Sequence, residues 1–310
     1  MAEKKALREA YGETLLELGR RNDKIVVLDA DLGNSTKSKT FAKEFPDRFF
    51  DMGIAECNLA GTAAGLAISG HTVFMSSFAM FAVGRAYEII RNSICYPKLN
   101  VKIAATHAGI TVGEDGASHQ CLEDIGLTRM LPGMQVFVPA DAVECREVIK
   151  YMAETEGPMY LRMGRSGQPV LFDDDYKFTP GKAVVLKEGN DCAVFACGIM
   201  VAEALEAADL LAKEGINISV INVSSIKPID KETITAYAKK CGCAVTAEEH
   251  NVINGLGSTV AEVLAENYPC KLSMVGVKDR FGQSGKPADL LKEYGLTADE
   301  ICKAVKNLIK

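Results

Sequence analysis

Short apolar segments rich in β-branched residues alternate with segments of helical periodicity along most of the chain. Strands separated by helices of this length are typical of βαβ units, because parallel strands need a crossover helix. The sequence therefore predicts an α/β fold of mostly parallel sheets flanked by helices. In the first half, the expected strands are 24–29, 49–52, 72–77, 101–106, 134–139 and 159–163, and the expected helices are 6–20, 36–44, 56–69, 80–93, 121–130 and 141–155. In the second half, the expected strands are 192–197, 218–223, 243–248 and 272–277, and the expected helices are 201–213, 231–240, 257–266 and two at the C-terminal end.

A polar segment over 165–190 interrupts this alternation with prolines, an acidic run and weak periodicity. A chain of 310 residues is long enough to form two separate cores. We therefore expect a first domain over 1–170, a linker over 171–190 and a second domain over 191–310, each domain with its own sheet.

Charge and hydropathy argue against several classes of partner. The net charge is −6 and no basic run is present, so a nucleic-acid surface is not expected. No apolar segment approaches the roughly 18 residues that a membrane span needs, and no signal-peptide core is recognisable. The ten cysteines stand mostly in apolar runs without metal-ligand spacing. These features predict a cytoplasmic protein with reduced cysteines.

The segment 107–120, HAGITVGEDGASHQ, is the richest in chemistry and directly follows a predicted buried strand. Its glycines allow sharp turns and a close approach to a ligand, so His107, Asp115 and His119 can point into one space. Loops that follow the strands of an open α/β sheet commonly carry the binding site. The segment therefore predicts a ligand-binding loop.

Several other segments leave two interpretations open. Glu56 begins a predicted helix, where it either complements the helix dipole or serves a ligand, and the small residues over 60–65 let another surface come close. Phe78 and Phe81 are expected to share a helical face, as core aromatics or as a wall for a flat ring. Ser35 is predicted to cap a helix.

Arg165 follows a predicted strand and is either a surface residue or a phosphate ligand. The cluster Glu248–His250, with NVINGLGS after it, is interpreted as structural: a strand end, a loop and a glycine-rich helix start.

Taken together, five ordered motifs resemble the C-terminal portion of transketolase. They are ADLGNS (30–35), GIAE (53–56), FAMF (78–81), ATHAGITVGEDGASHQ (105–120) and LRMGR (161–165). The segments 246–264 and 280–301 are similar to the C-terminal domain of the family, so the resemblance covers essentially the whole chain. It implies a thiamine-diphosphate pyrimidine-binding domain followed by a transketolase C-terminal domain.

The resemblance also implies a missing half. The superfamily holds the cofactor's diphosphate through Mg²⁺ with a GDG motif, and this sequence has no GDG. The chain therefore resembles the C-terminal subunit of a split transketolase, with no metal ligand of its own. An N-terminal partner subunit that carries the GDG motif is expected to hold diphosphate and Mg²⁺, in an α2β2 assembly with its sites at the interfaces.

The resemblance assigns roles to individual residues. Thiamine diphosphate acts as an ylid that carries a two-carbon glycolaldehyde unit from xylulose 5-phosphate to ribose 5-phosphate or erythrose 4-phosphate. Glu56 matches the glutamate that activates the aminopyrimidine ring of the cofactor, and Phe78, Phe81 and Asp31 match cofactor-binding positions. The residues that match sugar-phosphate contacts are Arg8, Ser35, His107, Asp115, His119 and Arg165, of which His119 is also catalytic.

Three positions depart from the family pattern: Ala55, Cys57 and Gly84 stand where an arginine, a histidine and a tyrosine are common. The pyrimidine wall is therefore expected to be thinner here. Three alternatives stay open: a protein similar to 1-deoxyxylulose-5-phosphate synthase, a protein similar to the β subunit of 2-oxo acid dehydrogenases, and a non-catalytic regulatory module.

Overall fold

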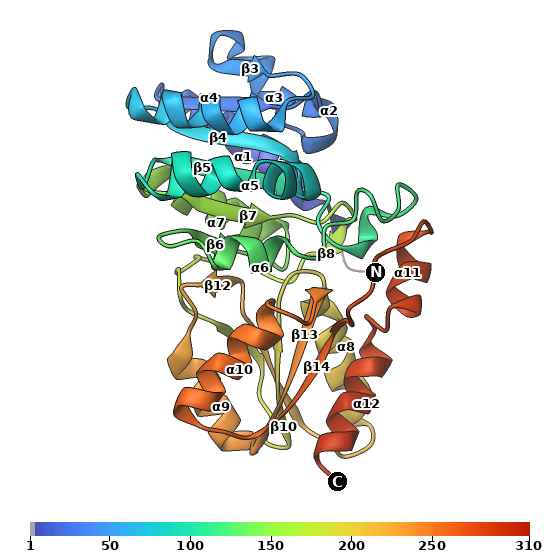
Figure 1. Ribbon diagram of the computed structural model, residues 1–310. Helices are drawn as coiled ribbons and strands as arrows, with labels where there is room; N and C mark the ends of the chain where they lie inside the picture. Colours follow the sequence, from blue (N-terminus) through green and yellow to red (C-terminus); the bar gives the residue numbers. More distant parts are fainter. Residues whose placement is uncertain (1–3) are drawn as a thin grey trace.

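The computed structural model describes residues 4–310, which form two α/β domains, one above the other in Figure 1. The first domain is built on a seven-stranded sheet and the second on a five-stranded sheet. Both sheets are mostly parallel and flanked by helices, so the predicted fold class is confirmed.

The first sheet draws one of its strands from the second half of the chain. In spatial order its strands are β12 (Ser225–Lys227), β6 (Gln135–Phe137), β7 (Met159–Arg162), β5 (Val101–Thr106), β4 (Thr72–Phe78), β2 (Ile25–Asp29) and β3 (Phe49–Asp51). The strand β12 pairs antiparallel with β6, whereas the other neighbours are parallel. The central strands are buried along their whole length, as a sheet covered on both faces requires.

Helices cover both faces of this sheet. One face packs against α1 (Leu7–Arg21), α3 (Lys39–Ala42) and α7 (Ala142–Glu154). The other packs against α4 (Glu56–Ile68), α6 (Asp124–Arg129) and the stretch 80–95. The remaining short elements are α2 (Gly33–Thr36) and the 3-10 turns η1 (Pro46–Arg48) and η4 (Ile110–Val112).

The stretch 80–95 corrects one prediction. The expected helix over 80–93 is two π-helical segments, η2 (Met80–Arg85) and η3 (Ile90–Cys95), on either side of the short α5 (Tyr87–Ile89). A π-helical turn is wider than an α-helical one and often marks a functional site. Here η2 carries Phe81, so the widened turn sets the direction of a candidate site residue.

The second sheet has the order β14 (Lys271–Val277), β13 (Cys243–Asn251), β10 (Cys192–Ala196), β11 (Ile218–Asn222) and β9 (Val184–Lys187). The edge strand β9 is antiparallel and lies within the segment predicted as a linker. The helices of the second domain are α8 (Met200–Ala212), α9 (Lys231–Cys241), α10 (Leu256–Asn267), α11 (Pro287–Glu293) and α12 (Ala298–Leu308). A two-stranded ribbon, β1 (Lys4–Lys5) with β8 (Gln168–Pro169), closes the first domain.

One of the three hydrophobic clusters among the described residues spans both domains. This cluster runs from Val73 and Ile103 in the first sheet to Phe195 and Val260 in the second domain. Such a continuous core favours a fixed arrangement of the domains over a hinged one. Across residues 4–310, all ten cysteines are free, and no helix is long and apolar enough to cross a membrane.

Candidate functional site

The candidate site lies where parallel strands of the first sheet end. Phe78 closes β4, and His107 directly follows β5. Asp31 follows β2, and Arg165 follows β7. Because these strands run parallel, their carboxyl ends meet at one edge of the sheet, which is where open α/β sheets bind ligands. Segments far apart in sequence are thus brought to one place.

Four rings form the centre of this site. The ring of Phe78 stacks on His107 with centroids 3.8 Å apart, and it stacks more loosely on Phe81 at 6.2 Å. The ring of His119 meets the edges of both phenylalanines, at 6.2 and 5.1 Å. The expectation that Phe78 and Phe81 share a helical face was wrong, because Phe78 is the last residue of a strand. Their rings meet because the chain turns into η2 directly afterwards.

His107 is held in an unusual conformation. Its φ of 58° lies in the left-handed region, its side chain is only 3% exposed, and its Nδ1 lies 2.9 Å from Thr106 Oγ1. Burial lowers the pKa of His107 to about 3, and the charges of Arg8 and Arg165 add to that effect. The imidazole is therefore neutral near pH 7, and it can offer a ligand a directional hydrogen bond rather than a charge.

Two arginines and Ser35 gather beside His107. Arg8 donates from Nη1 to the carbonyl oxygen of Ser35 at 3.0 Å, and its buried Nε has no partner among residues 4–310. Burial, together with the nearby Arg165, lowers the pKa of Arg8. Ser35 is not the predicted helix cap, because it lies inside α2 and Leu32 precedes that helix. A buried guanidinium nitrogen without a partner, next to a second cation, is suited to an anion such as a phosphate.

Glu56 begins α4, as predicted, and is only 2% exposed. Its Oε2 lies 3.4 Å from Nη1 of Arg85, whose guanidinium carbon lies 5.8 Å from the centroid of Phe81. Sequence reasoning had not assigned Arg85 to the site, although its position four residues after Phe81 on the same segment was a usable signal. The carboxyl group of Glu56 and the ring of Phe81 therefore lie on the same side of the site.

Asp31 and Asp115 take no part in these ring and guanidinium contacts within the described residues, and both are exposed. The backbone N–H of Asp31 donates to Oδ1 of Asp51, which also accepts from the N–H of Gly53 at the turn before Glu56. Asp31 is thus tied to the Glu56 side. Asp115 stands on the loop between the two histidines.

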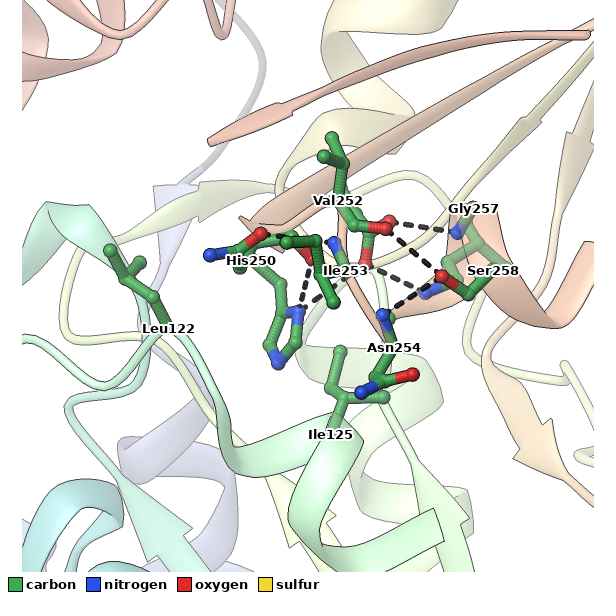
Figure 2. A network of polar contacts seen from close by, with 12 residues as sticks. Leu122, Ile125, His250, Val252, Ile253, Asn254, Gly257 and Ser258 are labelled. Atoms are coloured by element: carbon green, nitrogen blue, oxygen red, sulfur yellow. Dashed lines mark hydrogen bonds and ion pairs between the residues drawn. The ribbon is translucent and has the colours of Figure 1, made fainter. Parts of the chain in front are cut away.

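Residues of the second domain contact the predicted ligand-binding loop over 107–120. These contacts were not predicted from the sequence. Glu249 near the end of β13 accepts a hydrogen bond from the backbone N–H of Thr111, and Gln120 donates to the carbonyl oxygen of Gln283. The predicted strand end, loop and helix start around Glu248–His250 is confirmed. Figure 2 shows the turn after β13, with Ser258 bonded to Val252 and Asn254 and with His250 directed toward the segment of Leu122 and Ile125.

The arrangement fits a flat, basic heteroaromatic ring. A buried carboxyl group at Glu56 can accept a hydrogen bond from a ring N–H, and the half-buried Phe81 offers a face for stacking. On the opposite, exposed face of α4, a Cβ added at Gly61 or Gly65 would meet nothing within 4 Å. Within residues 4–310, no group of three or more His, Cys, Asp or Glu side chains is placed to hold a metal ion.

Comparisons with known proteins agree with this geometry. Two family models match: the transketolase pyrimidine-binding domain over residues 3–169 and the transketolase C-terminal domain over 181–301. A putative transketolase C-terminal section from Methanocaldococcus jannaschii is 50% identical over 309 residues, which is 99% of this chain and 97% of that protein. A 6-deoxy-6-sulfo-D-fructose transketolase subunit from a Clostridium species is 43% identical, over 96% of this chain and 92% of that protein. A solved split-gene transketolase, in an inactive β4 tetramer, has a TM-score of 0.92 at 59% identity, covering 98% of both chains.

Proposed function

Since the chain belongs to the transketolase family, we propose that it is the C-terminal subunit of a split transketolase. In this proposal it works with an N-terminal subunit to move a two-carbon ketol unit from a ketose phosphate to an aldose phosphate. Xylulose 5-phosphate is the proposed donor, and ribose 5-phosphate or erythrose 4-phosphate the acceptor. The observation that carries the proposal is the four-ring cluster, which lies between a buried carboxyl group and a pair of arginines.

The Glu56 side would hold the aminopyrimidine ring of thiamine diphosphate. Bound there, the cofactor supplies the electron sink needed to break and form a carbon–carbon bond beside a carbonyl group. Glu56 would hold a proton at N1′ of the ring, Phe81 and Phe78 would contact its face, and Asp31 would help shape the same side. A buried, positioned carboxyl group is suited to this proton-holding role.

The other side would bind the sugar phosphates. Arg8 and Arg165 would supply positive charge for the terminal phosphate, with the unpartnered Nε of Arg8 as one donor, and Ser35 would add a neutral hydroxyl donor. The neutral His107 would offer a hydrogen bond to the sugar, and Asp115 would contact a hydroxyl group of the acceptor. His119, next to both phenylalanine rings, would exchange protons with the substrate where sugar and cofactor meet.

The N-terminal partner would supply the diphosphate and Mg²⁺ contacts, in an α2β2 assembly. The exposed face of α4, the helix that Glu56 begins, supports the proposal of a partner subunit there. Ile54 and Ile68 are 77% and 73% exposed, and Phe50 is also exposed nearby. Gly61 and Gly65 between them leave the helix surface flat and open. Exposed large apolar side chains beside a flat surface are typical of a protein interface.

The test is reconstitution. The chain is mixed with its N-terminal partner, thiamine diphosphate, Mg²⁺, xylulose 5-phosphate and ribose 5-phosphate, and the products are separated. We expect sedoheptulose 7-phosphate from the pair and none from either subunit alone. A stable complex that forms none would refute this substrate assignment. A parallel assay with other ketoses covers the case raised by the Clostridium relative, which is named for a sulfonated fructose.

A further inference from the structure

Glu249 of the second domain holds the backbone of the ligand loop. Its Oε1 accepts a hydrogen bond of 2.6 Å from the N–H of Thr111, which is 138 residues away in sequence. The side chain is buried, so burial raises the pKa of the Glu249 carboxyl group, and the charge of Arg162 opposes that rise. Hydrogen bonds to a buried carboxyl group are stronger than ordinary ones, because water does not compete for either partner.

The loop is shaped to admit this carboxyl group. Gly109 has a φ of +86°, and a Cβ added there would collide with the carboxyl of Glu249. Any residue with a side chain at position 109 would therefore push Glu249 away from Thr111. The same glycine gives the loop wide conformational freedom when nothing holds it.

The second domain touches the loop again on the far side of Asp115. Gln120 donates from Nε2 to the carbonyl oxygen of Gln283 at 3.0 Å, and a Cβ at Gly116 would collide with Oγ of Ser284. Helix α11 packs against η4, and Figure 1 shows the loop beside this helix. The loop is thus held both before and after Asp115.

The side chain of Glu249 is not what joins the two domains. Arg162 donates to the backbone oxygen of Glu249, not to its carboxyl group, and it also pairs with Asp124 at 2.8 Å. A separate ion pair between Arg129 and Glu262 and the shared hydrophobic core link the domains elsewhere. The Glu249 carboxyl group can therefore be removed without separating the domains.

We propose that Glu249 is a positioning residue: through the N–H of Thr111, the second domain sets where Asp115 and His119 stand toward the sugar. The link to the sugar rests on the proposed function, whereas the hold on the loop does not. A catalytic side chain misplaced by about 1 Å can cost about 100-fold in rate, so such a hold has a direct effect on turnover.

The first experiment measures amide hydrogen exchange in the full-length chain, without substrate. In Glu249→Ala, we expect exchange over 110–120 to rise about 10-fold or more, with strands β10 and β5 unchanged. In Glu249→Gln, the exchange rate over 110–120 should stay close to that of the wild-type chain, because the amide oxygen of glutamine still accepts a hydrogen bond from the N–H of Thr111. Glu262→Ala, which breaks the ion pair with Arg129 between the two domains, is the matched control and should leave the loop protected.

If residues 110–120 exchange at the same rate in Glu249→Ala as in the wild-type chain, the proposal is wrong. It is also wrong if they exchange as fast in Glu249→Gln as in Glu249→Ala. If Glu249→Ala does not fold, Gly109→Ala applies the same test from the loop side. It should loosen 110–120 while Glu249 is intact, and unchanged exchange there would count against the hold.

The second experiment is kinetic and uses the complex with the N-terminal subunit. Glu249→Ala should raise KM for the sugars about 10-fold and also lower kcat, while the affinity for thiamine diphosphate stays unchanged, and Glu249→Gln should restore both KM and kcat. If KM does not change although amide exchange in the loop rises, Glu249 holds the loop but does not affect sugar binding. If the unchanged complex shows no transketolase activity, the proposed function fails, and the exchange experiment still decides the hold on the loop.

Discussion

The two sides of the site are built to different degrees. On the sugar side, His107 is buried, and its loop is bonded to the second domain at Thr111 and Gln120. On the proposed cofactor side, Glu56 is buried, but the outer face of its helix α4 is open at Gly61 and Gly65, with Ile54 exposed before the helix and Ile68 exposed at its end. The proposed sugar side is thus bonded to the rest of this chain, whereas the proposed cofactor side borders an exposed helix surface, which is where we propose that the second subunit binds. Four predictions test this comparison.

The largest effect is expected at Glu56. Glu56→Gln should lower kcat of the reconstituted complex about 1000-fold, because the amide cannot hold the proton at the cofactor ring. Circular dichroism should show an unchanged fold, and Glu17→Gln on the surface of α1 is the matched control. Activity within a few-fold of the unchanged complex would remove Glu56 from the cofactor side.

The open face of α4 should respond to bulk. Gly61→Leu should weaken assembly with the N-terminal subunit about 100-fold without lowering the melting temperature, since a Cβ there meets nothing in the isolated chain. Lys239→Leu on the exposed surface of α9 is the control for added apolar bulk. Sedimentation of the mixed subunits measures the effect, and unchanged assembly would place the interface elsewhere.

The phosphate contact should give a smaller and more selective effect. Arg165→Ala should raise KM for phosphorylated sugars about 30-fold and leave unphosphorylated acceptors nearly unaffected, because one charge-assisted contact is lost. Arg165 also donates to the carbonyl oxygen of Val112, so loop exchange should be measured alongside. An equal rise for both kinds of sugar would show that Arg165 acts through the loop rather than on the phosphate.

The smallest effect is on stability. His107 has a pKa of about 3 when folded and an ordinary value near 6.5 when unfolded, so between these values only the unfolded chain binds the proton. The free energy of unfolding therefore rises with pH across this window, by at most about 1.4 kcal/mol per pH unit from this group. His107→Gln should show a shallower rise than His71→Gln in urea unfolding at pH 5 and pH 7. Equal slopes would mean that His107 is not buried as a neutral ring.

The regular strands and helices, which follow from the local hydrophobic pattern, could be predicted from the sequence. The expected strand 101–106 matches β5, and the expected helix 56–69 differs from α4 by one residue. The π-helical turns over 80–95 were missed, because the periodicity of a short segment does not separate a π-helix from an α-helix. The three-residue strand β12 was also missed, because it forms only by pairing with β6.

The candidate site also has parts that could be predicted from the sequence and parts that could not. The motifs predicted which residues would follow the strands, and the structure brings most of them together. The bond between Glu249 and Thr111 could not be predicted, because it joins two domains across 138 residues. The Glu248–His250 cluster was interpreted as structural, and its polarity was the only local sign of a link to the loop.

We propose that this chain provides only part of the cofactor site and that the N-terminal subunit completes it. Calorimetric titration with thiamine diphosphate and Mg²⁺ tests it most directly, on this chain alone, on the N-terminal subunit alone and on the equimolar mixture. We expect tight binding only in the mixture, at one cofactor per pair of subunits. Binding of equal strength to this chain alone would contradict it.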